Sequence, residues 1–187
     1  DLGEAALLEA AAHPRVIAIG ETGLDYYYDH SDRAMQQALF RRHIAVSRTT
    51  GLPIIIHTRD AEDDTAAILR EEMEQGAFPA LIHCFTASAA FARIVLDLGL
   101  TISLSGIVTF KNATDLQAVA AQIPEDRLLV ETDAPFLAPV PNRGKVCEPA
   151  FVADTAKFVA QLRGVTPEAL AASTTQNFRR LFTKAAL

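Results

Sequence analysis

Several features that this sequence lacks exclude broad classes of protein. No apolar run approaches the roughly 18 residues that a membrane-spanning helix needs. No cationic start leads into an apolar stretch, so we expect no signal peptide. Cysteine is scarce: Cys84 and Cys147 lie far apart and form no Cys-x-x-Cys pair, so the simplest interpretation is a cytoplasmic protein with reduced thiols.

The chain also lacks an excess of basic residues. Its 17 lysines and arginines stand against 23 aspartates and glutamates, which gives a formal net charge of -6. This balance argues against the broad basic surface that binds duplex DNA. A phosphate-bearing substrate stays open, because bound metal ions are often the largest charges in a site.

What is present indicates an α/β protein. With 187 residues, half of them apolar, the chain suits one domain with a large core, and we interpret residues 1–187 as a single domain. Short runs rich in β-branched residues alternate with helical patterns, which predicts βαβ units and a parallel sheet. The carboxyl ends of such strands share one face; a barrel brings them to a common centre, whereas an open sheet spreads them along a crevice.

Predicted strands end in side chains that bind metals. The runs at residues 16–20, 53–56, 80–82 and 128–130 lead to Glu21, His57, His83 and the pair Glu131 and Asp133. Alternation along a strand predicts that the two acids share a face, and Glu131 is a candidate for orienting a ligand histidine. Singly, each histidine fits a core position and Asp133 a turn cap. Jointly, one glutamate, two histidines and one aspartate favour a divalent metal site, and their convergence favours the barrel.

Segments in order along the chain share the signatures of one enzyme family. Residues 19–27 read IGETGLDYY and resemble GE-x-GLDYY; residues 56–61 read IHTRDA and resemble IHSRDA; residues 82–86 read IHCFT and resemble HCFSG. Residues 105–113, SGIVTFKNA, and 130–137, VETDAPFL, also match. Over about residues 16–182, the chain therefore resembles the TatD-type metal-dependent deoxyribonucleases.

This resemblance implies a TIM-type (β/α)8 barrel of the amidohydrolase-like kind with a two-metal site. It implies that Glu21, His57, His83 and Asp133 are the ligands, that Glu21 bridges the ions and that Asp133 also acts as general base. Magnesium, manganese and zinc are not distinguished. The implied activity is 3′–5′ exonuclease cleavage of DNA phosphodiesters, with single strands or 3′ ends as the bound partner.

Three basic residues are candidates for phosphate contacts: Arg59, Arg143 and Lys145. The alternative is solvated surface charge and, for Arg59, pairing with Asp60 or Asp63. Tyr26, Tyr27 and Tyr28 are candidates for stacking on bases of a single strand, with packing between barrel and helix as the alternative.

The chain departs from the family pattern at two places. It contains no His-x-His pair, so we expect the first one or two strands to be absent, through truncation or because a longer protein contains this chain. A polypeptide that starts at Asp1 is expected to hold one weak metal at most and to show low or no nuclease activity. Val146 and Cys147 replace the usual basic and amide residues, which puts some substrate contacts in doubt.

Two other functions stay open. In the first, the protein uses the same barrel to hydrolyse another ester or an amide, because barrels of this kind host many substrates. In the second, a truncated, inactive barrel binds a partner.

Overall fold

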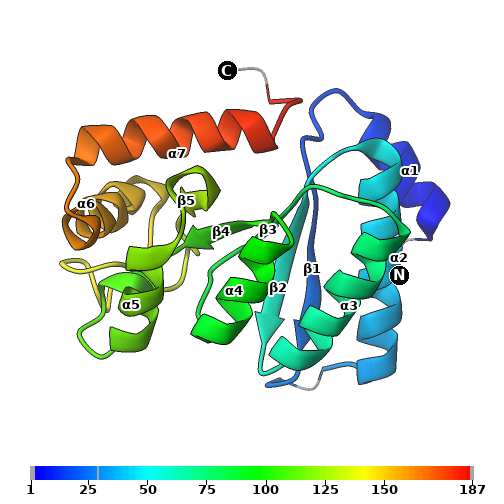
Figure 1. Cartoon of the computed structure of the whole chain (residues 1–187), viewed down its shortest axis with the longest axis horizontal. Coiled ribbons are helices and arrows are strands. Elements are labelled where there is room, and N and C mark those ends of the chain that lie inside the picture. The colour runs from blue at the N-terminus through cyan, green and yellow to red at the C-terminus, as the bar shows by residue number, and fades with distance from the viewer. Residues whose placement is uncertain (1–2, 29, 186–187) are drawn as a thin grey trace. The chain divides into compact units, whose positions relative to one another are not determined.

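The structure is a computed structural model that describes residues 3–28 and 30–185. Helices and parallel strands alternate along the chain, which confirms the predicted α/β class (Figure 1). The chain divides into two compact units: unit 1 comprises Asp1–Ile82 and Arg179–Leu187, and unit 2 comprises His83–Phe178.

Unit 1 is built on three parallel strands. Its elements are α1 (Glu4–Ala12), β1 (Ile19–Asp25), α2 (Arg33–Thr50), β2 (Ile54–Arg59), α3 (Glu62–Gln75) and β3 (Ala80–Ile82). Strand β2 lies between β1 and β3, with Ile54 in register with Ile19 and Ile56 in register with Ile82. Helices α2 and α3 lie side by side next to these strands (Figure 1).

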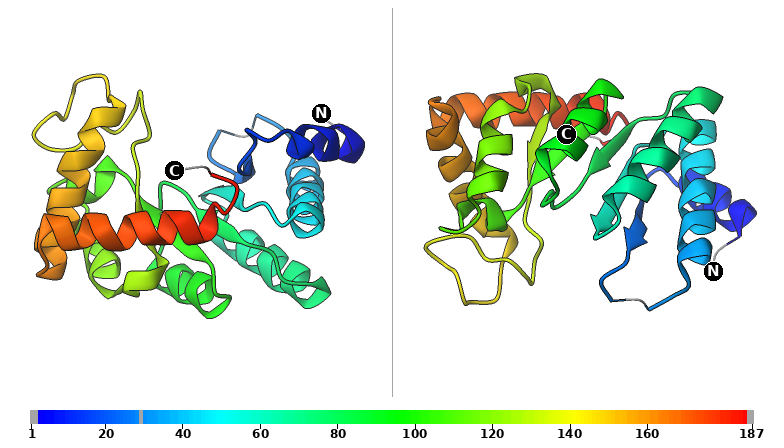
Figure 2. Two further views of the ribbon diagram at one scale, coloured as in Figure 1. Left: turned by 90° about the horizontal axis from the view of Figure 1, so that it is seen from above. Right: turned by 60° about the horizontal axis from the view of Figure 1, so that its bottom comes forward.

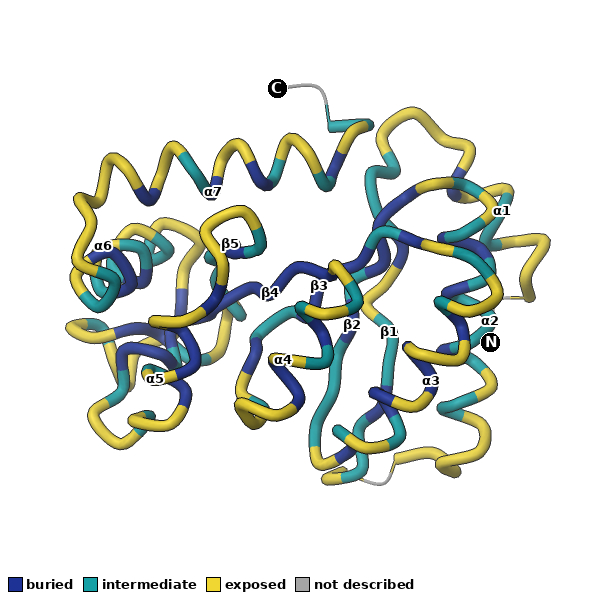
Figure 3. Tube along the Cα trace, viewed as in Figure 1, coloured by how far each residue is buried: buried dark blue, intermediate teal, exposed yellow. Residues whose placement is uncertain are grey.

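Local sequence explains the boundaries of helix α2 and the burial of its inner side. The Asp32 carboxylate accepts a hydrogen bond from the Met35 amide at the N-terminus, and Gly51 ends the helix in the left-handed conformation at φ 70°. Phe40 and Ile44 of this helix are fully buried, as are strand residues of the same unit, among them Leu24, Ile54 and Ile56 (Figure 3). Each such side chain contributes about 1.5–3 kcal/mol through burial.

Unit 2 contains two parallel strands and the remaining helices. Its elements are α4 (Ala89–Asp97), β4 (Thr101–Leu104), η1 (Gly106–Thr109), α5 (Thr114–Gln122), η2 (Glu125–Arg127), β5 (Leu128–Val130), η3 (Pro149–Phe151), α6 (Val152–Arg163) and most of α7 (Pro167–Leu181). Ile102 of β4 is in register with Leu128 of β5. Helix α5 contacts both α4 and α6, as can be followed in Figure 2.

Helix α7 is capped at its start and buried along part of its second half. The Thr166 hydroxyl accepts a hydrogen bond from the Ala169 amide. The helix continues to Leu181 because polar residues in its second half are buried in unit 2. The Asn177 side chain, 4% exposed, donates to the carbonyls of Glu125 and Leu128 at 2.7 and 2.8 Å.

Two expected strand boundaries are wrong. Strand β1 does not end before Glu21 but runs to Asp25, because its second half pairs with β2 and aligns Gly23 with His57. This approach requires glycine: a Cβ at Gly23 would lie 2.0 Å from the His57 carbonyl oxygen. Strand β2 likewise does not end at Ile56 but runs to Arg59. Strand β5 ends at Val130 as expected, so strand alternation does not set the directions of the two acids that follow it.

Candidate metal centre

Glu21 and His57 face each other from neighbouring strands of unit 1. Glu21 Oε1 lies 3.3 Å from His57 Nδ1, and the side chains are 52% and 30% exposed. Two ligand atoms about 2.0–2.1 Å from a tetrahedral ion are roughly 3.3–3.4 Å apart. The carboxylate and the imidazole therefore fit a shared divalent cation, which can enter from solvent.

Asp25 fixes the orientation of the His57 ring. Its Oδ2 lies 3.1 Å from His57 Nε2. We assign the ring proton to Nε2, which donates to the carboxylate, so that the other nitrogen, Nδ1, faces Glu21 as a ligand. Carboxylates behind metal-binding histidines act in this way, setting the tautomer and raising the basicity of the ligand nitrogen.

The position of Asp25 is itself fixed by hydrogen bonds. Its Oδ1 accepts from the amides of Tyr27 and Tyr28 at 3.0 and 3.1 Å. The Gln36 side chain accepts from the Asp25 amide at 2.8 Å and donates to the Asp25 carbonyl at 3.1 Å. Burial acts to raise the pKa of Asp25, but hydrogen bonds from the Tyr28 amide, the His57 ring and the Tyr27 amide outweigh burial and lower it. The group is a carboxylate at neutral pH.

Sequence reasoning missed this role of Asp25. Its signal was the spacing from Glu21: positions 21, 23 and 25 of an extended strand point to the same side. The signal is missed because the strand is expected to end at Gly20, before this spacing begins.

In unit 2, His83 lies beside the carboxylate that was expected to orient a ligand histidine. Glu131 Oε1 lies 3.3 Å from His83 Nδ1 and accepts from the Cys84 amide at 2.7 Å. This confirms that Glu131 contacts a predicted ligand. Strand β3 ends at Ile82, so Cys84 is not a strand residue; its thiol lies 3.1 Å from the Ser105 hydroxyl.

Asp133 lies in the loop after β5 and is half-buried. Its carbonyl accepts from the Phe136 amide at 2.7 Å, which closes a turn. Burial, followed by the charge of Asp133, raises the pKa of Cys147. Cys147, which departs from the family pattern, is therefore buried and sensitive to the charge of a predicted ligand.

The three predicted phosphate contacts have local partners. The Arg59 guanidinium lies 3.9 Å from the centre of the Tyr27 ring and 4.8 Å from that of Tyr28. Arg143, on the exposed loop after β5, lies 4.3 Å from the centre of the Phe110 ring. Lys145 donates to the Asn142 side chain at 3.2 Å.

A cavity of about 380 Å³ adjoins the Glu21–His57 pair. Its lining combines both candidate ligands with other residues of β1, the loop that follows it and helix α2: Glu21, Thr22, Gly23, Asp25, Tyr28, His30, Ser31, Gln36 and His57. The candidate ligands therefore open onto a space that can admit a substrate group.

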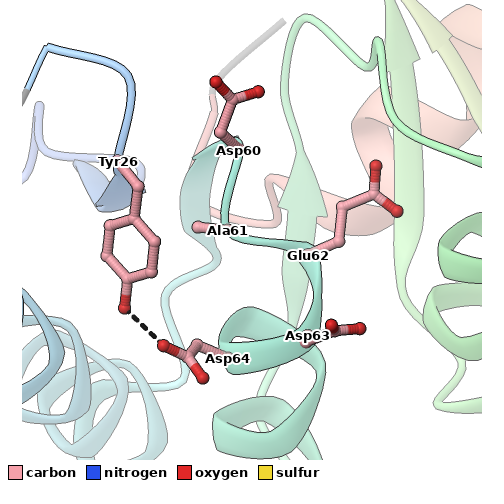
Figure 4. Close-up of a pocket in the computed structure, with 6 residues that line it drawn as sticks. All are labelled: Tyr26, Asp60, Ala61, Glu62, Asp63 and Asp64. Carbon is pink, nitrogen blue, oxygen red and sulfur yellow. Dashed lines mark hydrogen bonds between the residues drawn. The ribbon is translucent and has the colours of Figure 1, made fainter.

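A second cavity of unit 1 is lined by acids at the start of helix α3 (Figure 4). The Tyr26 hydroxyl points at Asp64 and donates to its carboxylate at 2.6 Å (Figure 4). Acids in a first helical turn interact favourably with the helix dipole, which accounts for Glu62, Asp63 and Asp64 without a ligand. Tyr26 is therefore a packing residue, as one alternative held.

Comparison with known proteins assigns the family. Residues 2–183 match the family model described as TatD related DNase. The chain belongs to this family. A TatD relative from Escherichia coli (strain K12), named uncharacterized metal-dependent hydrolase YcfH, is 53% identical over 176 residues, which cover 94% of this chain and 66% of the relative. The chain thus spans slightly less than two thirds of that relative.

Two further TatD relatives bear on substrate and fold. A protein from Rahnella sp. (strain Y9602), named 3′-5′ ssDNA/RNA exonuclease TatD, is 37% identical over 96% of this chain and 70% of its own length. The crystal structure of YJJV, a TatD homolog from Escherichia coli K12, superposes with a TM-score of 0.86 at 28% identity over 96% of this chain and 70% of that one. Among the described residues, no helix is long and apolar enough to cross a membrane.

Proposed function

We propose that the protein is a metal-dependent hydrolase that acts as a 3′–5′ exonuclease on single-stranded DNA, with Glu21, His57, His83 and Asp133 as ligands of two divalent ions. The observation that carries this proposal is the Glu21–His57 pair, with its ring orientation set by Asp25. Membership of the TatD related DNase family supports the metal, and the name of the Rahnella relative supports the substrate.

The register of unit 1 supports a role for His83. Ile56 of β2 is paired with Ile82, the last residue of β3. His57 follows Ile56 in the chain, and His83 follows Ile82. Equivalent positions at the ends of neighbouring parallel strands belong to one edge of a sheet. We therefore assign both histidines to the same ion, and Asp133 to the second.

The side chains divide the work of phosphodiester hydrolysis. When bound, divalent ions supply charge neutralisation and a nucleophile at neutral pH. Asp133 would accept the proton of the attacking water, and Glu21 would hold the ions through its carboxylate. Arg143 and Lys145, both exposed, neutralise phosphate oxygens of the nucleic acid backbone. We assign the reaction to the cytoplasm, which agrees with the free thiols of Cys84 and Cys147.

The test is degradation of a single-stranded oligonucleotide, labelled at its 5′ end, by the natural polypeptide with added Mg²⁺ or Mn²⁺. Products that shorten one nucleotide at a time, and that disappear with a chelator, are expected. Glu21→Gln should lower the rate more than about 100-fold, because loss of a ligand exceeds the 10- to 100-fold cost of losing a partner behind one. Glu168→Gln, at the exposed start of α7, is the matched control and should act like wild type.

Two outcomes contradict the proposal. The first is equal activity of the Glu21→Gln variant and the wild type. The second is a wild type that hydrolyses a lactone, amide or phosphotriester with added metal but leaves oligonucleotides intact, which would favour another substrate for the same barrel.

A further inference from the structure

We propose that Tyr27, Tyr28 and Arg59 form a stacking platform that binds a nucleobase of the substrate beside the Glu21–His57 pair. The platform rests on the proposed function and goes beyond it, since it assigns residues that hold a base rather than a phosphate. All three residues belong to unit 1.

Exposure separates two of the three consecutive tyrosines from ordinary packing residues. Tyr27 and Tyr28 are 58% and 55% exposed, whereas Tyr26 is half-buried and donates its hydroxyl to Asp64. Tyrosine buries much of its ring when it serves only to pack. Packing therefore accounts for Tyr26 and leaves two aromatic faces at the surface.

The two exposed rings contact each other, and the guanidinium of Arg59 lies over both. Tyr27 and Tyr28 meet edge to face, with ring centres 4.9 Å apart and an interplanar angle of 87°. The Arg59 guanidinium lies within 4.8 Å of both ring centres, and the His30 ring stacks on Tyr28 at 5.3 Å and 4°. Aromatic faces next to arginine are what proteins use to bind bases of single strands without reading their sequence.

One carboxylate links the platform to the candidate ligands. Asp25 accepts from the amides of Tyr27 and Tyr28 through Oδ1 and contacts His57 through Oδ2. Tyr28 also lines the cavity of about 380 Å³ that contains Glu21 and His57. A base held by the rings is therefore kept at a fixed offset from the ligand pair, which places a neighbouring phosphodiester in that cavity. This arrangement favours single strands, because bases in a duplex have no face to offer.

The test removes the bases from the DNA and, separately, the aromatic rings from the protein. The probes are a single-stranded DNA oligonucleotide and the same oligonucleotide with abasic residues at its 3′ end, both measured for equilibrium binding by fluorescence anisotropy in chelator. The protein variants are the double substitutions Tyr27→Ala with Tyr28→Ala, and Tyr27→Phe with Tyr28→Phe. The phenylalanine pair keeps the rings and serves as the matched control.

Wild type and the phenylalanine variant should bind the intact oligonucleotide roughly 5- to 150-fold more tightly than the abasic one, since each base stacked on an aromatic ring contributes about that factor. The alanine variant should bind both equally. In turnover measurements, loss of the rings or of the bases should raise KM and change kcat less, because the rings position the substrate and do not touch the reacting atoms.

Each result decides between the platform and the proposed function. Binding in chelator requires no hydrolysis, so a wild type that prefers bases but cleaves no oligonucleotide keeps the platform and overturns the nuclease. A wild type that cleaves DNA but binds both probes equally overturns the platform alone, as does an alanine variant that keeps the preference. If the alanine pair fails to fold, as judged by circular dichroism, the wild-type comparison of the two probes still decides.

Discussion

Replacing Asp25 with asparagine should weaken metal binding because it moves the ring proton of His57 from Nε2 to Nδ1. The side-chain carbonyl oxygen of the new asparagine can take the place of Oδ1 and accept from the amides of Tyr27 and Tyr28, which lie 3.0 and 3.1 Å away. The new NH₂ group then replaces Oδ2, 3.1 Å from His57 Nε2, and requires that nitrogen to accept. The ring proton moves to Nδ1, which faces Glu21 and can no longer bind a cation.

The size of the effect follows from known losses of such partners. Removing the hydrogen-bond partner of a ligand histidine costs 10- to 100-fold in metal affinity, or about 1.4–2.7 kcal/mol. We expect Asp25→Asn to lie in this range. Competition for Mn²⁺ or Zn²⁺ with a fluorescent chelator measures the affinity directly.

The matched control is Asp32→Asn. Asp32 is exposed, lies in the same unit and caps helix α2, and asparagine caps a helix as well as aspartate does. Its metal affinity should equal that of wild type. An Asp25→Asn protein that keeps its circular dichroism spectrum and binds metal within about twofold of wild type would refute the assigned tautomer and the role of Asp25.

Three further predictions concern stability in unit 1, each measured by urea unfolding. Gly23→Ala should cost about 3 kcal/mol or more, because the new Cβ would lie 2.0 Å from the His57 carbonyl oxygen at φ +141°; a cost under about 1 kcal/mol contradicts the β1–β2 register. Glu72→Gln should lower the free energy of unfolding by about 1–3 kcal/mol, since the Glu72 side chain is 6% exposed and lies between two arginines that are themselves partly exposed. The Glu71 side chain is 57% exposed, so Glu71→Gln should change this free energy little. Burial and then a hydrogen bond to a carboxylate raise the pKa of Tyr26, so its stabilisation is present below its ordinary pKa and is lost as pH rises through the higher one. Tyr26→Phe should therefore cost about 1 kcal/mol at about pH 8, and the cost should shrink above about pH 10; a constant difference would refute the raised pKa.

Local physics accounts for the part of the fold that the sequence predicts. Helix α2 begins and ends at residues that favour helix ends: Asp32 accepts from the Met35 amide at the start, and Gly51 ends the helix in the left-handed conformation. The apolar, β-branched run before His57 is a strand because such side chains pack well on a pleated surface, and the strand before His83 ends at Ile82 as expected. Topology then predicted that Glu21 and His57 lie together, which the structure confirms.

Non-local pairing accounts for what the sequence does not predict. The second half of β1 contains Gly23 and Asp25, which have low strand propensity, and it is extended because β2 pairs with it as far as Arg59. The role of Asp25 depends on that register, since only a strand that continues past Glu21 brings it to His57. Likewise, the last turns of α7 depend on the burial of Asn177 against the start of β5. The roles of Glu21, His57, His83 and Asp133 as ligands stay predictions.

The most direct test of the metal centre is pulsed electron paramagnetic resonance of Mn²⁺ added to the natural polypeptide. We predict nitrogen couplings from two histidines, and loss of one of them in each of the variants His57→Asn and His83→Asn. Bound Mn²⁺ without nitrogen coupling, or couplings that both variants leave unchanged, would contradict the account.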